Sequence, residues 1–253
     1  MTAETPARGC RRWRLLLLGV LTVWMLLVCG ALLAGVWNRP SHRAVIAMTW
    51  GVILVWVAGC GGTQWHWRDF WLGLADRVRM PWGVKFVLGA IALALVEEAV
   101  TTAMTNAAPL FGVKRGEAYI TASSNYLDVV LRHSVVAFIP LFIGWAVILS
   151  RWRFSPFAVF VLFGITGTLA ETLTFGPQNL GNAGFWILVY GLMVWLPAHF
   201  PPPNRSARDP EWYHYPLAVV IPFLFMPLLA VIAPWLWLFP GHPHIHFPPI
   251  TGP

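Results

Sequence analysis

Two adjacent carboxylates, Glu97 and Glu98, lie inside an apolar stretch that runs from Trp82 to Asn106. A charged side chain at bilayer depth is costly, so carboxyl groups in such a stretch indicate a functional site. On a helix, the two glutamates share one side with the polar residues one and two turns further on, Thr101, Thr102, Thr105 and Asn106. We therefore predict that this side faces a polar chamber, with Thr101, Thr102 and Asn106 as substrate- or ion-binding groups and Asp128 as a further such group at its mouth.

The chemistry of such a pair follows from the low dielectric around it. Two carboxyl groups this close cannot both ionise at low cost, so we expect them to share a proton. The pair would suit a general acid or base, a proton carrier or a cation ligand. Glu171 is a third acid of this kind and shares a helix face with Gly164, Thr168 and Thr172. The alternative is that each acid only forms a hydrogen bond that joins two helices.

Asp128 and His133 precede another apolar stretch. A histidine close to the three glutamates would complete a His/carboxylate metal site or an acid–base pair. The simpler interpretation pairs Asp128 with Arg132 as an i,i+4 ion pair.

Three histidines alternate near the C-terminus, as His242-Pro-His244-Ile-His246. In an extended chain, alternate side chains lie on one face, so all three imidazoles could bind one divalent ion such as Zn²⁺ or Cu²⁺. The alternative is a Pro-rich tail that binds no metal.

The elements that must position these residues are membrane helices. The chain is 58% hydrophobic and 11% charged, against roughly 25% charged residues in soluble domains. Its long apolar runs predict an all-α, polytopic membrane helix bundle. We expect about seven transmembrane helices, at residues 13–37, 44–62, 82–106, 133–150, 156–175, 185–200 and 217–239. We also expect an interfacial amphipathic helix and a short re-entrant or surface helix, at residues 64–80 and 121–132.

The predicted organisation is a basic N-terminal segment (1–12), a membrane domain (13–239) and a His- and Pro-rich tail (240–253). If the N-terminus is cytoplasmic, most basic residues fall on the cytoplasmic side, as the positive-inside rule requires; they are Arg8, Arg11, Arg12, Arg14, Arg68, Arg77, Arg79, Lys85, Arg151, Arg153, Arg205 and Arg208. The remaining ones fall outside, at Arg39, Arg43, Lys114, Arg115 and Arg132. This orientation in a cell (inner or plasma) membrane gathers the acids and histidines toward the outer leaflet. It also explains the net charge of +7 without a nucleic acid as partner.

The Glu97-Glu98 pair resembles the first motif of the CAAX-protease and bacteriocin-processing family of intramembrane glutamic proteases. That motif reads Glu-Glu-x-x-x-Arg, and later spans supply Phe-x-x-x-His and His-x-x-x-Asn or Asp. The resemblance covers these two residues. Thr102 stands where the motif has its arginine, and no histidine follows a phenylalanine by four residues within a later span. The protease activity is therefore not carried over.

These features predict an intramembrane hydrolase or transferase that acts on a lipid or another membrane-embedded substrate. Glu97 or Glu98 would act as the base that activates water, or both would bind a divalent metal such as Zn²⁺ together with His133. Two other functions stay open. One is a proton- or cation-coupled transporter whose last span is interrupted by prolines. The other is a structural or assembly subunit whose acids only join helices.

Overall fold

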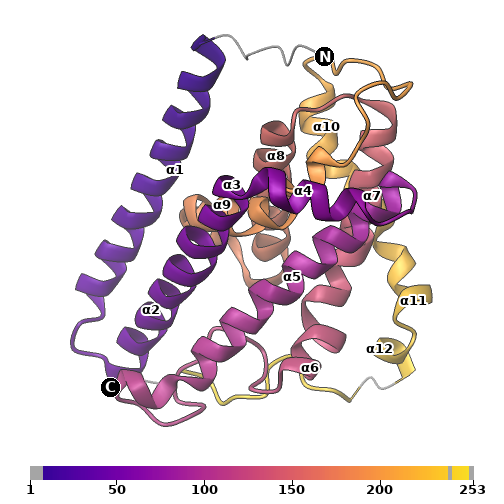
Figure 1. Ribbon diagram of the computed structural model, residues 1–253. Helices are drawn as coiled ribbons and strands as arrows, with labels where there is room; N and C mark the ends of the chain where they lie inside the picture. Colours follow the sequence, from indigo (N-terminus) through magenta and orange to yellow (C-terminus); the bar gives the residue numbers. More distant parts are fainter. Residues whose placement is uncertain (1–7, 239–240, 251–253) are drawn as a thin grey trace.

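The computed structural model describes residues 8–238 and 241–250. Most of the predicted N-terminal segment lies outside these residues, as do Phe239 and both ends of the predicted tail. Within the described residues the secondary structure is helical, apart from two isolated bridges (Figure 1).

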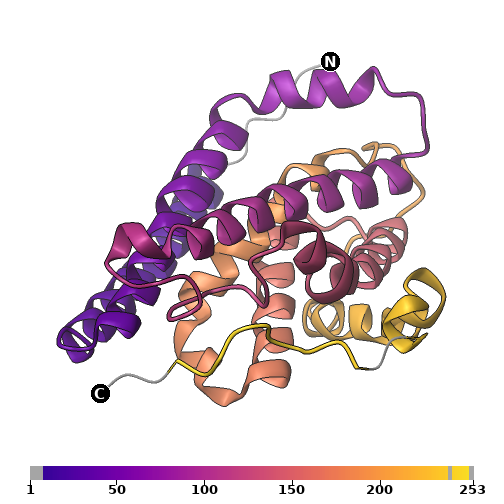
Figure 2. The ribbon, with the colours of Figure 1, turned by 90° about the horizontal axis from the view of Figure 1, so that it is seen from below.

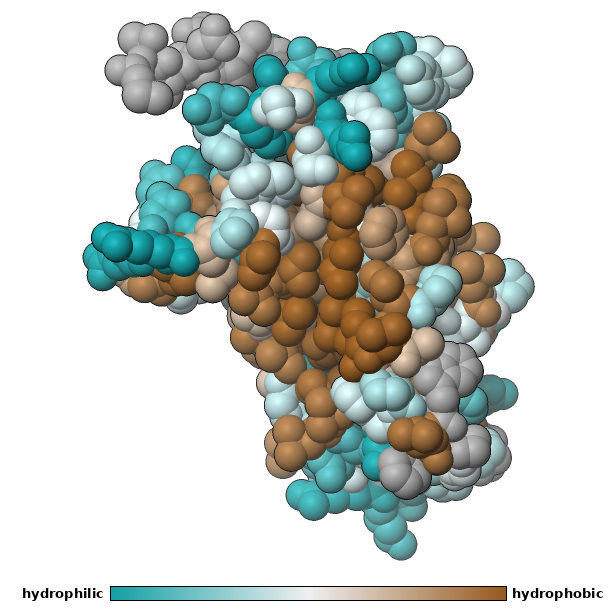
Figure 3. Space-filling model, turned by 90° about the vertical axis from the view of Figure 1, so that its right-hand side faces the viewer, coloured by the Kyte–Doolittle hydropathy of each residue, from teal (hydrophilic) through white to brown (hydrophobic). Residues whose placement is uncertain are grey.

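Five helical segments are long and apolar enough to cross a membrane. They are α1 (Arg8–Gly35), the continuous helix α2–η1–α3 (Pro40–Val52, Ile53–Cys60 and Gly61–His66), α5 (Trp82–Asn106), α8 (Pro156–Phe175) and the helix α10–η6–α11 (His214–Val220, Ile221–Leu228 and Leu229–Ile232). A sixth span results if Tyr126–His133 and α7 (Val135–Arg151), which are bent by 47° relative to each other, cross together. The molecule shows a broad apolar band between polar ends (Figure 3). The chain is therefore an integral membrane protein.

The predicted count of seven spans is not confirmed, because the helix at the sixth predicted position is short. This helix, α9, covers Ala183–Trp195 and is followed by the 3₁₀ turn η5 (Pro197–His199). It packs tightly against α8: a Cβ atom added to Gly167 would lie 2.2 Å from the ring of Tyr190. The close packing brings Tyr190 next to the end of α8, where Glu171 lies.

The region predicted as an interfacial helix forms the end of α3 and a second helix, α4 (Arg68–Asp76), with a break at Trp67. Apolar side chains remain exposed along it, at Trp67, Phe70, Leu74 and Val78. α4 runs across the direction of the spans (Figure 1). This arrangement suits a helix that lies at the membrane surface.

The opposite end of the bundle, which we call the tail end, is where residues 241–250 lie (Figures 1 and 2). It contains η2 (Ala108–Phe111), α6 (Tyr126–Asp128), the π-helical turn η3 (Val129–His133) and η4 (Pro177–Asn182). The short helix α12 (Trp235–Leu238) precedes the tail. The predicted surface helix at residues 121–132 begins later than expected, because Asn125 caps α6 and its side chain accepts a hydrogen bond from the Leu127 amide (3.0 Å).

Candidate metal centre and acidic cavity

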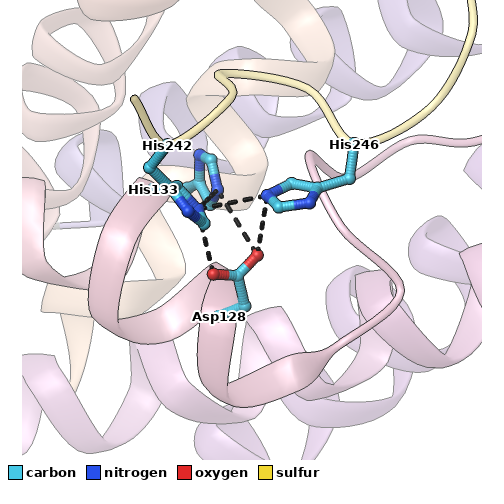
Figure 4. A group of neighbouring side chains, drawn as sticks. All are labelled: Asp128, His133, His242 and His246. Atoms are coloured by element: carbon cyan, nitrogen blue, oxygen red, sulfur yellow. Dashed lines mark hydrogen bonds and ion pairs between the residues drawn. The ribbon is translucent and has the colours of Figure 1, made fainter. Parts of the chain in front are cut away.

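Four side chains with metal-binding atoms meet at the tail end (Figure 4). Asp128, His133, His242 and His246 each offer one ligand atom, and these atoms all lie within 4.8 Å of one another. The Nε2 atom of His242 lies 3.3 Å from Nε2 of His133 and 3.1 Å from Nε2 of His246. One oxygen of the Asp128 carboxylate (Oδ1) lies 3.0 Å from Nε2 of His242. The other (Oδ2) lies 3.0 Å from Nε2 of His246 and 3.6 Å from Nε2 of His133.

These spacings are close to those expected between the ligand atoms of a tetrahedrally coordinated ion. Zinc–nitrogen and zinc–oxygen distances are about 2.0–2.1 Å, which places neighbouring ligand atoms of a tetrahedron about 3.3 Å apart. Imidazole nitrogen and carboxylate oxygen are both common zinc ligands, and imidazole also suits copper. The cluster therefore has donor atoms that suit zinc, and several of them lie at spacings close to those of a tetrahedral site.

The C-terminal part of α5 holds the segment that carries Asp128. The Asn106 amide donates to the Ser124 carbonyl (2.9 Å), and the hydroxyl of Tyr126 donates to the Leu95 carbonyl (2.9 Å). Asn106, predicted to bind substrate or an ion, thus fixes the start of α6.

Thr105 holds the preceding loop. Its hydroxyl accepts hydrogen bonds from the Ile120 amide and the Thr121 hydroxyl, both at 3.1 Å. The polar side of α5 therefore positions the loop as well as facing the cavity described below.

The tail is attached to this loop by two further contacts. The backbone amide of His246 donates to the Ala122 carbonyl (2.8 Å), and the ring of Phe247 stacks on Tyr119 with 4.7 Å between ring centroids. Just before the tail, the indole of Trp235 donates to the Leu131 carbonyl (2.9 Å).

Arg132 lies beside the cluster. Its guanidinium is 2.7 Å from Nδ1 of His242 and 3.9 Å from the carboxylate of Asp128, which is the predicted i,i+4 pair. Because arginine only donates, Nδ1 of His242 must accept in this arrangement, and a neutral ring then carries its proton on Nε2. A metal on Nε2 would require the proton on Nδ1 instead. Arg132 and a metal ion therefore compete for His242.

A cavity of about 1110 Å³ adjoins the cluster, with His133 in its wall. Glu97, Glu98, Glu171 and Thr101 also line it. The side of α5 predicted to face protein does so: Glu97 is 6% exposed and Glu98 is 9% exposed.

The three glutamates differ in their hydrogen-bond partners. The Thr101 hydroxyl donates to the carboxylate of Glu98 (3.1 Å), and the hydroxyl of Tyr190 donates to that of Glu171. The carboxylate of Glu97 has no hydrogen-bond partner among the described residues. Within residues 8–238 and 241–250, none of the three forms an ion pair with a basic side chain.

The predicted residues thus separate into two neighbouring groups. Asp128, His133, His242 and His246 form the cluster, whereas the three glutamates and Thr101 line the cavity. His244 also lines the cavity and is not one of the four cluster residues. Thr102 is buried with its hydroxyl unpaired, outside the residues that line the cavity.

Sequence reasoning missed Tyr190, the partner of Glu171. A single tyrosine in an apolar helix has the pattern of any core aromatic residue, so no sequence signal distinguishes it. Arg132 was recognised only as the partner of Asp128, since its contact with His242 joins residues far apart in the chain.

Comparisons with models of protein families, with curated proteins and with solved structures find no match. The fold and the site together define a helical integral membrane protein with a candidate metal centre at one end.

Proposed function

We propose that this protein is a metal-dependent membrane enzyme, a hydrolase or transferase that acts on a lipid or another membrane-embedded substrate. One observation supports the proposal most directly: four potential ligands from distant parts of the chain meet at one point. Asp128 and His133 come from α6 and η3, and His242 follows His133 by 109 residues.

The cavity residues have roles that fit this chemistry. A Zn²⁺ ion held by three of the cluster residues, with water in the fourth position, would supply a Lewis acid and activate that water. His133 belongs both to the cluster and to the cavity wall, so a substrate in the cavity would lie beside the cluster. Glu98, oriented by Thr101, is the group we assign as the general base that takes the proton from water. General acid–base catalysis of this kind typically contributes about 10²–10⁴-fold to the rate.

The extent of the cavity favours an enzyme over a transporter. The described residues that line it include none from α3, α4 or η5, the elements at the end opposite the tail. Beyond Leu141, which lines the cavity, α7 continues with the fully buried side chains of Phe142 and Trp145. A transporter would need a second opening through this packed region.

The environment of Glu97 favours a functional site over a purely structural role for the acids. An acid that only joins helices should have a partner on another helix, as Glu171 has in Tyr190. Glu97 is more deeply buried than Glu171 and faces the cavity without such a partner.

We further propose that the tail end is extracytoplasmic in a cell membrane and that the N-terminus is cytoplasmic. The basic residues of α4 and of the α7–α8 connection support this orientation, because they gather at the end opposite the tail. Labelling of a cysteine introduced at Pro249 by an impermeant thiol reagent on intact cells would be expected. Labelling only after lysis would reverse the orientation.

The enzymatic proposal is tested by isotope incorporation. The purified full chain is reconstituted with Zn²⁺ into vesicles made from a total lipid extract, in water enriched in ¹⁸O, and the lipids are analysed by mass spectrometry. A hydrolase produces lipids that carry the label, and a transferase produces a new lipid without it.

The control variants separate metal chemistry from background. His242→Ala and chelated wild-type protein should form no product. His66→Ala, which changes a histidine of α3 outside the cluster and the cavity, should behave as the wild type. Equal product from His242→Ala, or none from the wild type, would contradict the proposal.

A further inference from the structure

The cavity opens among apolar side chains of the membrane spans. Several large apolar residues that line it are also exposed: Trp24 (40%) and Leu32 (43%) of α1, Leu173 (78%) and Phe175 (56%) of α8, and Ile245 (41%) of the tail. Both helices are long and apolar enough to cross a membrane. The wall of the cavity is therefore continuous with the exposed apolar surface of these two spans.

The interior has an apolar wall and one acidic region. Most of the wall consists of aliphatic and aromatic side chains, such as Met25, Val52, Phe138 and Met226. The volume of about 1110 Å³ exceeds the range of roughly 300–1,000 Å³ that is usual for small-molecule pockets. A long hydrocarbon chain and a small polar end can both be accommodated.

The acidic region of the cavity determines which kind of polar group a bound lipid can carry. Carboxyl groups from Glu97, Glu98 and Glu171 line the cavity, and Glu97 is buried with no partner among the described residues. Among the described residues that line the cavity, Arg132 is the one arginine or lysine, and it already contacts Asp128 and His242. Every carboxyl group accepts hydrogen bonds and each ionised one repels anions, so a group with N–H or O–H donors suits this region better than a phosphate does.

We propose that the cavity binds a long-chain lipid whose polar end carries hydroxyl, amide or amine donors and no phosphate. The lipid enters sideways from the bilayer past the exposed side chains that line the cavity, with its polar end at Glu97 and next to His133. That this lipid is the substrate rests on the proposed function, whereas its binding requires no metal.

Binding is tested by native mass spectrometry on the purified full-length protein in detergent. The probes share one saturated chain and differ in the polar end: monostearoylglycerol, octadecylamine and octadecyl phosphate. We expect the first two to be retained at least tenfold more than the phosphate. Equal retention of the three, preference for the phosphate, or retention of none would overturn the inference.

Two matched variants locate the binding. Ala137→Trp fills part of the cavity and should abolish retention, whereas Leu88→Trp places the same side chain on an exposed face of α5 outside the cavity and should not. Glu97→Gln should reduce retention of octadecylamine most, because it removes a potential negative charge. Retention by Ala137→Trp equal to that by Leu88→Trp would contradict the assigned cavity.

The same measurement on His242→Ala in the presence of a chelator separates this inference from the proposed function. Unchanged lipid retention in this variant, together with no ¹⁸O incorporation by the wild type, would support the lipid-binding site and contradict the proposed enzymatic function. Enzymatic turnover of phospholipids alone, without retention of the uncharged lipid, would support the enzymatic function and contradict the proposed lipid-binding site.

Discussion

Removal of the metal should release residues 241–250 from the bundle. The contacts of this segment beside the cluster are few, mainly the bond from the His246 amide to Ala122 and the stack of Phe247 on Tyr119, and each contributes about 1 kcal/mol. Ordering a backbone costs roughly 1–2 kcal/mol per residue, which is on the order of 10 kcal/mol for such a segment. Structural zinc contributes about 10–16 kcal/mol in small peptides. The metal should therefore decide whether the tail is bound.

Hydrogen exchange at the His246 amide measures this directly. At a free zinc concentration of about 100 times Kd, binding stabilises the docked state by about 2.7 kcal/mol, which corresponds to roughly hundredfold slower exchange. We expect the His246 amide to exchange about this much more slowly when zinc is present. The protection should be lost when a chelator is added or in the His133→Ala variant. His244→Ala, outside the cluster, should keep the response. Equal protection with and without zinc would refute the reasoning.

Three further predictions concern single side chains. Arg132→Ala should raise zinc affinity by about tenfold, or ~1.4 kcal/mol, in a competition titration with a zinc chelator, because it removes a competing donor to His242; a weaker affinity would show that the arginine supports the site. Glu98→Gln should lower turnover by about 10²–10⁴-fold with zinc content unchanged, and normal turnover would remove its role as base. Gly167→Ala should lower the free energy of unfolding by about 1–3 kcal/mol through overpacking against α9, whereas Gly62→Ala, with nothing within 4 Å of the added atom, should not; thermal unfolding of both variants in detergent tests this difference.

Local signals predicted some helix boundaries well. α5 and α8 have the bounds expected from the sequence. Both begin next to a proline, and the Ser155 side chain accepts a hydrogen bond from the Ala158 amide at the start of α8. α8 ends at Phe175, and the capping residue Gly176 has a φ of 105°, which favours glycine. Such stop and start signals act within a few residues, which is why they can be read from sequence.

The division of the site into two groups could not be predicted. The expectation that Glu97, Glu98 and His133 bind one metal assumes that these polar groups form a single site. The spacing of residues along a helix, however, contains no information about which residues the C-terminal tail contacts. An extended tail would also present all three histidines on one face, whereas His242 and His246, four residues apart, meet Asp128. Contacts between residues more than 100 positions apart depend on how the whole bundle packs.

The predicted number of seven spans was not confirmed for a related reason. Hydropathy measures how apolar a stretch is, and α9 is apolar because it is buried against α8 rather than because it has membrane length. The sequence alone does not distinguish these two causes.

Zinc analysis combined with X-ray absorption on the purified full chain tests the central claim most directly. We predict one zinc ion per chain in the wild type and in His244→Ala, with nitrogen and oxygen ligands at about 2.0–2.1 Å. Asp128→Ala and His133→Ala should lose it. A wild-type protein that binds no zinc, or variants that bind it as tightly as the wild type, would contradict the existence of a metal centre at the tail end.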